Sequence, residues 1–536
     1  MKRVILTALS ISLMPVLGYG QSFPPVDAAV GTWMMHHGST SLSGLQLLRG
    51  AVTGPHVKCS YWLGHGGEGD PVIADINGDG LNEIVIVAWG GSYVSAFRGT
   101  DCSLLWSRDI GGTGGVTPAV GELNPSIPGL EIAVMLANGN LYALRGTDGA
   151  ILWSRYIGGS YNMSPPTIFD ANGDGVGEVY VVGDNIYALR GTDGSIIWSY
   201  PASAGDGAWK WSSIAIADIN NDGQYEVATV GYSGGSWRVL VLRATDGAFL
   251  WSYFVGSQGN PAIADLDNDG YKEIVVATDN GMLYALRHNG TLYWSRNMGY
   301  GAYPGFMNSP TIADLNGDGW KEIVYGHYQW NGSCYNQYVH VLRGTNGSTI
   351  WSYSGPCSGY QVHARKIADI DNDGQIEIIL TSMSYGPPPY IVVLNGATGA
   401  VEWTYSDLPL EGLSIGDVDN DGCVEIVATT PDCCYFASFV VFDSPTPVSG
   451  CGILGEDEEL KVEEDRNIGG VYLLVSPVKG GVNVETGRRA FVEIYTTDGR
   501  KVKGLEVDRS AFVELKKGTY VFRVKGHNLY RTVIVK

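Results

Sequence analysis

The sequence predicts an all-β protein: an eight-bladed β-propeller followed by a small C-terminal β-sandwich. Two sequence signals recur in alternation, eight times each, at intervals of about 50 residues. Between them lie short β-branched and aromatic runs separated by Asn-Gly and Asp-Gly turns. The 536 residues include 75 glycines, about twice the usual density, and only 17% are charged, which disfavours helical bundles, coiled coils and disordered chains. Seven blades is the alternative count.

The chain begins with an apparent export signal. Residues 1–20 combine Lys2 and Arg3 with an apolar run and small residues, which predicts a signal peptide cleaved near Gln21. An uncleaved N-terminal anchor is the alternative, although the run is shorter than the ~20 residues of a membrane-spanning helix. The expected domains are the propeller over 21–450, an acidic linker over 451–468 and the sandwich over 469–536.

Each repeat predicts four antiparallel strands. The fifth copy reads PAIADL (261–266), EIVVAT (273–278), MLYALR (282–287) and TLYWS (291–295), with no sustained period of 3.6. One such sheet cannot bury both of its faces alone, which favours a ring of blades.

The two ends of the repeat region predict how the ring closes. The last repeat lacks a tryptophan strand, and His56–Trp62 precedes the first acidic loop, so this segment is expected to complete the last blade. An open solenoid is the alternative. The repeated tryptophans are expected to lock neighbouring blades. They are Trp62, Trp106, Trp153, Trp198, Trp251, Trp294, Trp351 and Trp403.

The second signal, Asp-x-Asn/Asp-x-Asp-Gly-x-x-Glu, predicts a cation-binding loop. Positions one, three, five and nine supply oxygen ligands, and glycine at six permits a tight turn. Oxygen-only ligands favour Ca²⁺, up to seven ions, whereas turn capping alone is the competing explanation. The predicted ligands are Asp75, Asn77, Asp79, Glu83, Asp170, Asn172, Asp174, Glu178, Asp218, Asn220, Asp222, Glu226, Asp265, Asp267, Asp269, Glu273, Asp314, Asn316, Asp318, Glu322, Asp369, Asp371, Asp373, Glu377, Asp417, Asp419, Asp421 and Glu425. The degenerate second copy, around Glu122, contains prolines and is expected to bind no metal.

Strand parity places the acidic loops and the turns between the third and fourth strands on one face. Long aromatic loops then gather on the opposite face, which is a candidate for binding a sugar or a protein, or for plugging the funnel. The ligand candidates there are Trp209, Trp211, Trp237, Tyr303, Trp330, Tyr338 and Tyr385. Eight cysteines in an exported chain allow disulfides, of which Cys334 with Cys357 is the preferred pair.

The acidic loops resemble the FG-GAP or VCBS repeats of integrin α-subunit propellers and bacterial surface proteins, over about 65–443. The tryptophan segments resemble the docking motif of quinoprotein-type (PQQ-like) propellers, with Thr32–His37 like their entry strand. The tail is similar to the sorting domain of the type IX secretion system, with Ser476-Pro477-Val478 in place of Pro-Asn-Pro, followed by 492–502, 515–525 and 530–536. This likeness implies contact with the secretion machinery. An ordinary sandwich domain is the alternative.

These features lead us to expect a secreted or outer-surface calcium propeller that binds a glycan or protein partner without catalysis. A net charge of −21 argues against nucleic acid as partner. No nucleophile elbow, His-Glu-x-x-His or phosphate loop is present. The alternatives are a polysaccharide lyase of the rhamnogalacturonan type and a quinone-dependent dehydrogenase, since related propellers host both.

Overall fold

The computed structural model describes most of the repeat region and the strands of the tail. Described are Thr32 and residues 34–451, apart from 36–37, 43, 65, 68, 89–92, 113–115, 159–163, 203–211, 300–308, 331–332, 334, 359–361, 383–389, 432–437, 447 and 449, together with the strands between 473 and 535. These residues form strands, turns and loops and no helix. None of them makes a helix that could cross a membrane. The predicted signal peptide and most of the acidic linker lie outside this part of the chain.

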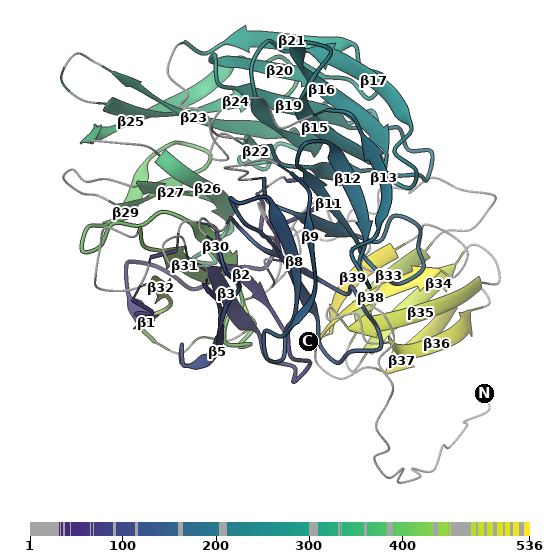
Figure 1. The fold of residues 1–536 in the computed structure, drawn as a ribbon. Coiled ribbons are helices and arrows are strands. Elements are labelled where there is room, and N and C mark those ends of the chain that lie inside the picture. The colour runs from purple at the N-terminus through teal and green to yellow at the C-terminus, as the bar shows by residue number, and fades with distance from the viewer. Residues whose placement is uncertain are drawn as a thin grey trace, which may run out of the picture.

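Eight four-stranded antiparallel sheets follow one another around a ring (Figure 1). From the innermost strand outward, blade 1 contains β2 (Val72–Ala74), β3 (Glu83–Val87), β4 (Tyr93–Arg98) and β5 (Leu104–Asp109); blade 2, β6 (Ala119–Gly121), β7 (Glu131–Met135), β8 (Asn140–Arg145) and β9 (Ile151–Tyr156); blade 3, β10 (Thr167–Phe169), β11 (Glu178–Val182), β12 (Ile186–Arg190) and β13 (Ile196–Tyr200); blade 4, β14 (Ala215–Ala217), β15 (Glu226–Ser233), β16 (Ser236–Arg243) and β17 (Phe249–Phe254); blade 5, β18 (Gly259–Ala264), β19 (Glu273–Thr278), β20 (Met282–Leu286) and β21 (Leu292–Asn297); blade 6, β22 (Thr311–Ala313), β23 (Glu322–Trp330), β24 (Tyr335–Arg343) and β25 (Thr349–Ser358); blade 7, β26 (Val362–Ala368), β27 (Glu377–Ser382), β28 (Ile391–Asn395) and β29 (Val401–Tyr405); and blade 8, β30 (Leu413–Gly416), β31 (Glu425–Thr429), β32 (Phe439–Phe442) and β1 (Val57–Tyr61).

The ring closes through a strand from the opposite end of the repeat region. β1 pairs antiparallel with β32, with Val57 opposite Phe442 and Tyr61 opposite Phe439. The innermost strand of blade 8, β30, contacts β2 of blade 1 and so completes the inner circle. The predicted closing strand is therefore confirmed, and the ring has eight blades, so the alternative count of seven is wrong.

The residues of each blade become more exposed from the innermost strand to the outermost one. In blade 5, every residue of β18 and β19 is buried, whereas β21 alternates between exposed and half-buried residues. The inner strands are covered on both faces by neighbouring blades, which explains their continuous apolar sequences. The outermost strands have one edge in solvent, and they carry polar residues such as Ser295, Arg296 and Asn297 of β21.

The repeated tryptophans join each blade to the next one. Trp153 donates its indole N–H to the Gly191 carbonyl at 2.6 Å, and its ring lies where a side chain on Gly194 would collide with it. Gly194 has a positive φ of 66°, so glycine is required there for both conformation and space. The same indole bond is made by Trp106, Trp198, Trp251, Trp294 and Trp351. The predicted locking role is confirmed for these six residues.

A segment before β1 lies against the innermost strands of the ring. Its start overlaps Thr32–His37, which the sequence likened to an entry strand; of these residues, Thr32, Met34 and Met35 are described and belong to no strand. We call residues 34–52 the axial segment. Its backbone hydrogen-bonds to the innermost strands or adjoining loops of several blades, by way of Met34, Thr40, Ser41, Gln46 and Arg49. The partners are Val120, Ile216, Ile263, Ile367 and Val424. Gln46 is fully buried and its side-chain amide donates to the Ile415 carbonyl at 2.9 Å.

Two disulfides lie where the ring is closed. Cys59 of β1 is bonded to Cys102 in the turn between β4 and β5 of blade 1, and Cys423 is bonded to Cys451. Cys102 takes the turn position that glycine occupies in other blades and has a positive φ of 59°. The first disulfide thus fastens the last blade to the first. The predicted pair Cys334 and Cys357 lies outside the residues whose side chains are described.

The tail contains two further antiparallel sheets. One has the order β33 (Leu473–Val478), β34 (Gly481–Thr486), β37 (Ser510–Glu514), and the other β36 (Lys501–Val507), β35 (Ala490–Thr496), β38 (Gly518–Val524), β39 (Tyr530–Val535). Together these sheets contain seven strands. The packing of these sheets into a sandwich stays a prediction.

Candidate cation-binding loops

The seven acidic loops share one backbone design. Each connects the innermost strand of a blade to the second strand, and the position-nine glutamate is the first residue of that second strand. In the loop of Asp265, the Asp265 carboxylate accepts the Gly270 N–H at 2.9 Å, and Glu273 accepts the Leu266 N–H at 3.0 Å. Equivalent bonds recur in the other six loops. All seven glutamates are buried.

Two positions of each loop adopt left-handed backbone conformations. Position six is always glycine, with φ between 83° and 89°. Position four is glycine in three loops and asparagine in four, again with positive φ, as for Asn268 at 55°. Asparagine is the residue other than glycine that tolerates this conformation best. The tight turn that results directs the side chains of positions one, three and five inward.

Position three divides the loops into two classes. Asn-type loops begin at Asp75, Asp170, Asp218 and Asp314, and Asp-type loops begin at Asp265, Asp369 and Asp417. In two Asn-type loops, the amide of Asn77 or Asn172 donates to the free oxygen of the closing glutamate, at 2.9 Å to Glu83 and 2.6 Å to Glu178. An aspartate at position three cannot make that bond because a carboxylate has no N–H.

The Asp-type loops contain buried carboxylate oxygens without hydrogen-bond partners. These are Asp265 Oδ1, Asp267 Oδ1, Glu273 Oε1, Asp369 Oδ1, Glu377 Oε1, Asp417 Oδ1 and Glu425 Oε1. No such oxygen of the described chain belongs to an Asn-type loop. Leaving buried anionic oxygens unpaired is costly, and a bound divalent cation would satisfy several of them at once.

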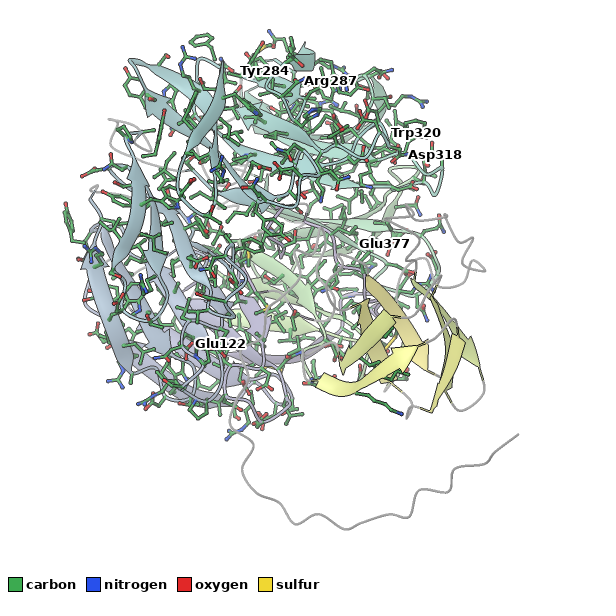
Figure 2. All side chains as sticks on the ribbon, turned by 90° about the vertical axis from the view of Figure 1, so that its right-hand side faces the viewer. Glu122, Tyr284, Arg287, Asp318, Trp320 and Glu377 are labelled. Atoms are coloured by element: carbon green, nitrogen blue, oxygen red, sulfur yellow. A yellow bond between two sulfur atoms is a disulfide. The ribbon has the colours of Figure 1, made fainter. Side chains whose placement is uncertain are left out.

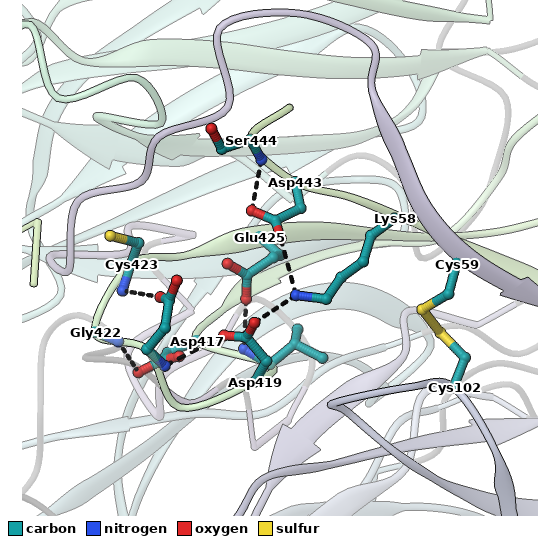
Figure 3. Close-up of polar contacts among 12 residues, drawn as sticks. Lys58, Cys59, Cys102, Asp417, Asp419, Gly422, Cys423, Glu425, Asp443 and Ser444 are labelled. Atoms are coloured by element: carbon teal, nitrogen blue, oxygen red, sulfur yellow. Dashed lines mark hydrogen bonds and ion pairs between the residues drawn. A yellow bond between two sulfur atoms is a disulfide. The ribbon is translucent and has the colours of Figure 1, made fainter. Parts of the chain in front are cut away.

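A basic side chain lies beside each Asp-type loop. Arg287 Nη1 is 3.3 Å from Asp267 Oδ2, and Arg49 Nε of the axial segment is 3.2 Å from Asp369 Oδ2. Lys58 Nζ of the closing strand lies 2.5 Å from Asp419 Oδ2 and 2.8 Å from Asp443 Oδ2 (Figure 3). These cations offset part of the extra negative charge. The free oxygens of position one and of the closing glutamate stay without a donor.

Burial raises the pKa of the closing glutamates, and the nearby aspartates raise it further. The pKa of Glu377 rises to about 10, that of Glu425 lies well above its ordinary value, and that of Asp417 rises to about 7. The pKa rises to about 8 for Glu83 and to about 7 for Glu178 in the Asn-type loops, and to about 7 for Glu273 in the third Asp-type loop. Without a cation, Glu377, Glu425 and Glu83 therefore retain protons near neutral pH.

In four loops the acidic oxygens converge closely enough to hold a metal ion, with ligand atoms within 4.8 Å of one another. The converging groups are Asp170, Asp174 and Glu178; Asp265, Asp267 and Asp269; Asp369, Asp371 and Glu377; and Asp417, Asp419 and Glu425. The predicted ligands of the loops at Asp75, Asp218 and Asp314 have the same backbone design without forming such a group among the described residues. All three Asp-type loops are among the converging ones.

The second repeat retains part of the design. Glu131 begins β7 and accepts the Leu123 and Asn124 N–H groups at 2.8 and 2.9 Å, as the closing glutamates do elsewhere. Sequence reasoning missed Glu131 because this loop is one residue longer than the others. Its position at the start of an apolar strand was the available signal. The prediction that this loop binds no metal stays a prediction.

The predicted ligand face is only partly described. Trp237 is half-buried and packs edge-on against Tyr232 at 5.5 Å between ring centroids. Tyr338 stacks on His327 at 5.2 Å. The other five candidates, Trp209, Trp211, Tyr303, Trp330 and Tyr385, lie outside the residues whose side chains are described.

Comparisons with known proteins support the repeat and the ring. Residues 265–325, which span the loops of Asp265 and Asp314, match the FG-GAP-like repeat family. No curated protein matches the chain. Among solved structures, the chain is similar to the quinohemoprotein alcohol dehydrogenase of Comamonas testosteroni, with a TM-score of 0.55, 13% identity, and coverage of 78% of this chain and 81% of that one. The chain is also similar to a europium-containing methanol dehydrogenase, with a TM-score of 0.54, 12% identity, and coverage of 75% of this chain and 90% of that one. At such identities the likeness shows the propeller fold alone.

Proposed function

We propose that this protein is an exported, calcium-stabilised propeller that binds a glycan or protein partner at the cell surface without catalysing a reaction. The observation that carries the calcium part is the set of buried, unpartnered carboxylate oxygens in the Asp-type loops. Aspartate, glutamate and asparagine oxygens at positions one, three, five and nine would hold the ion. A hard cation with oxygen ligands fits this donor set, which contains no histidine or cysteine.

The two disulfides and the absence of a membrane-crossing helix among the described residues are compatible with an extracellular protein. Export through the N-terminal signal and the sorting-like tail is part of the same proposal. Millimolar calcium outside cells would fill loops of the affinity that extracellular modules show, about 10⁻⁴ to 10⁻³ M. The ring would then act as a rigid platform with its loops available for recognition.

A quinone-dependent dehydrogenase is the second candidate, favoured by the likeness in fold. Such a function requires a cavity for the cofactor. In this chain the axial segment hydrogen-bonds to the innermost strands or adjoining loops of several blades, next to the axis where such a cavity would have to lie. We derive no reaction step from it.

The decisive experiment combines a binding screen with activity assays. The full-length protein in calcium is tested on a glycan array, for unsaturated products from acidic polysaccharides, and for dye reduction with an added quinone cofactor. The proposal expects binding without product or dye reduction. Turnover in either assay would replace it with the corresponding enzyme.

A further inference from the structure

A pocket opens on the acidic-loop face of blade 6. It has a volume of about 330 Å³ and is lined by Asp318, Trp320, Lys321, Arg343, Gly344 and Thr345. Buried Glu322 forms part of its wall. The Trp320 side chain is 45% exposed although it lies beside this wall, and Figure 2 shows Trp320 next to Asp318 at the surface of the ring.

The equivalent place in blade 5 contains a stacked pair of rings. There, Tyr271 occupies the loop position of Trp320 and stacks on His288, with 4.3 Å between ring centroids and 24° between planes. In blade 6 the residue that corresponds to His288 is Gly344, so the ring that stacks on Tyr271 has no counterpart beside Trp320. Both side chains are exposed, Trp320 at 45% and Tyr271 at 40%, but only Tyr271 already stacks on a ring of its own blade.

Arg343 lacks the turn ion pair that two of the equivalent arginines make. Arg145 and Arg243 pair with an aspartate three residues later in the Thr-Asp-Gly turn, at 2.7 and 3.0 Å. Blade 6 reads Thr-Asn-Gly, so Asn346 stands where that aspartate would be. Arg343 makes no ion pair with any described residue, and Glu322 is the acid on which its charge acts.

The geometry points to a subsite for one uronic-acid unit of an acidic glycan. A guanidinium binds a carboxylate through two parallel hydrogen bonds. An exposed indole offers a flat apolar surface for the carbon face of a pyranose ring, with its N–H end polar. Lys321 adds a second positive charge, and Thr345 can bond to a hydroxyl group. A volume of about 330 Å³ is at the low end for ligand pockets and suits a single sugar unit.

This inference rests on the proposed binding function and names its ligand. It also moves recognition to the acidic-loop face, away from the aromatic loops predicted from sequence. Trp320 and Arg343 are not among the proposed cation ligands. Their substitution therefore separates glycan binding from calcium binding.

The test is calorimetric titration of the full-length protein, in millimolar calcium, with a galacturonic-acid trimer, its methyl ester and a neutral galactose trimer. We expect the acid to bind at least about tenfold more tightly than either neutral probe, since one charge-assisted contact is worth about that factor. Arg343→Gln and Trp320→Ala should each weaken binding of the acid by about tenfold or more. Arg243→Gln and Tyr271→Ala are the matched controls and should bind as the parent protein does. The melting temperature of each variant in calcium verifies folding.

Equal binding of acid and ester, or unchanged binding by Arg343→Gln, would overturn the subsite. Failure to bind any uronic acid, together with array binding of another glycan that Trp320→Ala leaves intact, would overturn this inference and leave the proposed function standing. Absence of binding to every array glycan and to defined surface proteins would instead contradict the proposed function itself.

Discussion

The Asn-type and Asp-type loops share one backbone design and are distinguished by an asparagine or an aspartate at position three. In the Asn-type loops of blades 1 and 3, the amide of Asn77 or Asn172 satisfies the closing glutamate from within the loop. In the Asp-type loops, the same glutamate oxygen is buried without a donor, and a basic residue has been recruited nearby. The comparison leads us to propose that the side chain at position three decides how strongly a loop depends on a cation.

The largest expected effect comes from removing calcium. Each filled site stabilises the folded ring by about 2.7 kcal/mol when free calcium is a hundred times its dissociation constant. EGTA should therefore lower the melting temperature, and excess calcium should restore it. Calorimetry of the same sample with and without chelator measures this. A melting temperature insensitive to EGTA would mean that the loops are turns only.

The next effect is that the calcium-free protein should lose stability as the pH rises. Burial raises the pKa of Glu377 from about 4.5 to about 10, so the folded state binds more protons than the unfolded one between those values. Its contribution to stability is complete below pH 4.5 and is lost as pH rises towards 10, at up to about 1.4 kcal/mol per pH unit for each proton. Melting temperatures from pH 5 to 9 should fall without calcium and stay level with it. A calcium-free protein that gains stability from pH 5 to 9 would contradict the raised pKa of Glu377.

Exchanging asparagine and aspartate at position three should exchange the calcium dependence of two loops. Asp371→Asn gives Glu377 an amide donor and removes a charge, so the calcium-free protein should gain about 1 kcal/mol while its calcium-dependent gain shrinks. Asn172→Asp should do the opposite in blade 3, because it removes the bond to Glu178. The two variants are each other's control, and urea unfolding with and without calcium measures both. Identical shifts in the two variants would refute the distinction between the classes.

The smallest effect concerns the lysine of the closing strand. Burial opposes the charge of Lys58, but hydrogen bonds with Asp419 and Asp443 outweigh it and raise the Lys58 pKa. Lys58→Met should cost the calcium-free protein about 1 kcal/mol or less. Calcium should recover most of that loss, because the cation then neutralises Asp419. Arg243→Met, at an exposed turn ion pair, provides the comparison and should respond equally with and without calcium.

Much of the ring was predictable because it is repeated. Seven acidic loops and eight tryptophan strands specify the blades, and the place of His56–Trp62 before the first loop indicated the closing strand. The axial segment was not predictable, since its residues repeat nothing and its contacts come from blades far apart in sequence. The pairing of Cys59 with Cys102 depends on ring closure, which brings β1 beside blade 1. A cysteine in place of the turn glycine at 102 was the one local signal.

The candidate site was predictable in composition and only partly in organisation. The motif identifies the ligand types, and the structure shows the closing glutamates buried at strand starts. The contrast at position three was visible in the sequence, but its consequence was not. Whether Asn77 reaches Glu83 depends on side-chain geometry inside the loop. In the same way, the pocket beside Trp320 depends on how the acidic loop of blade 6 and the turn at 343–345 lie next to each other, which the sequence does not show.

Equilibrium dialysis of the purified protein against radioactive calcium, up to millimolar concentrations, tests the central claim most directly. The account predicts saturable binding of several ions per chain, at most seven, with the Asp-type loops filling first and Asp371→Asn removing or weakening one site. Binding that stays at the background of a calcium-independent control protein throughout this range would contradict it.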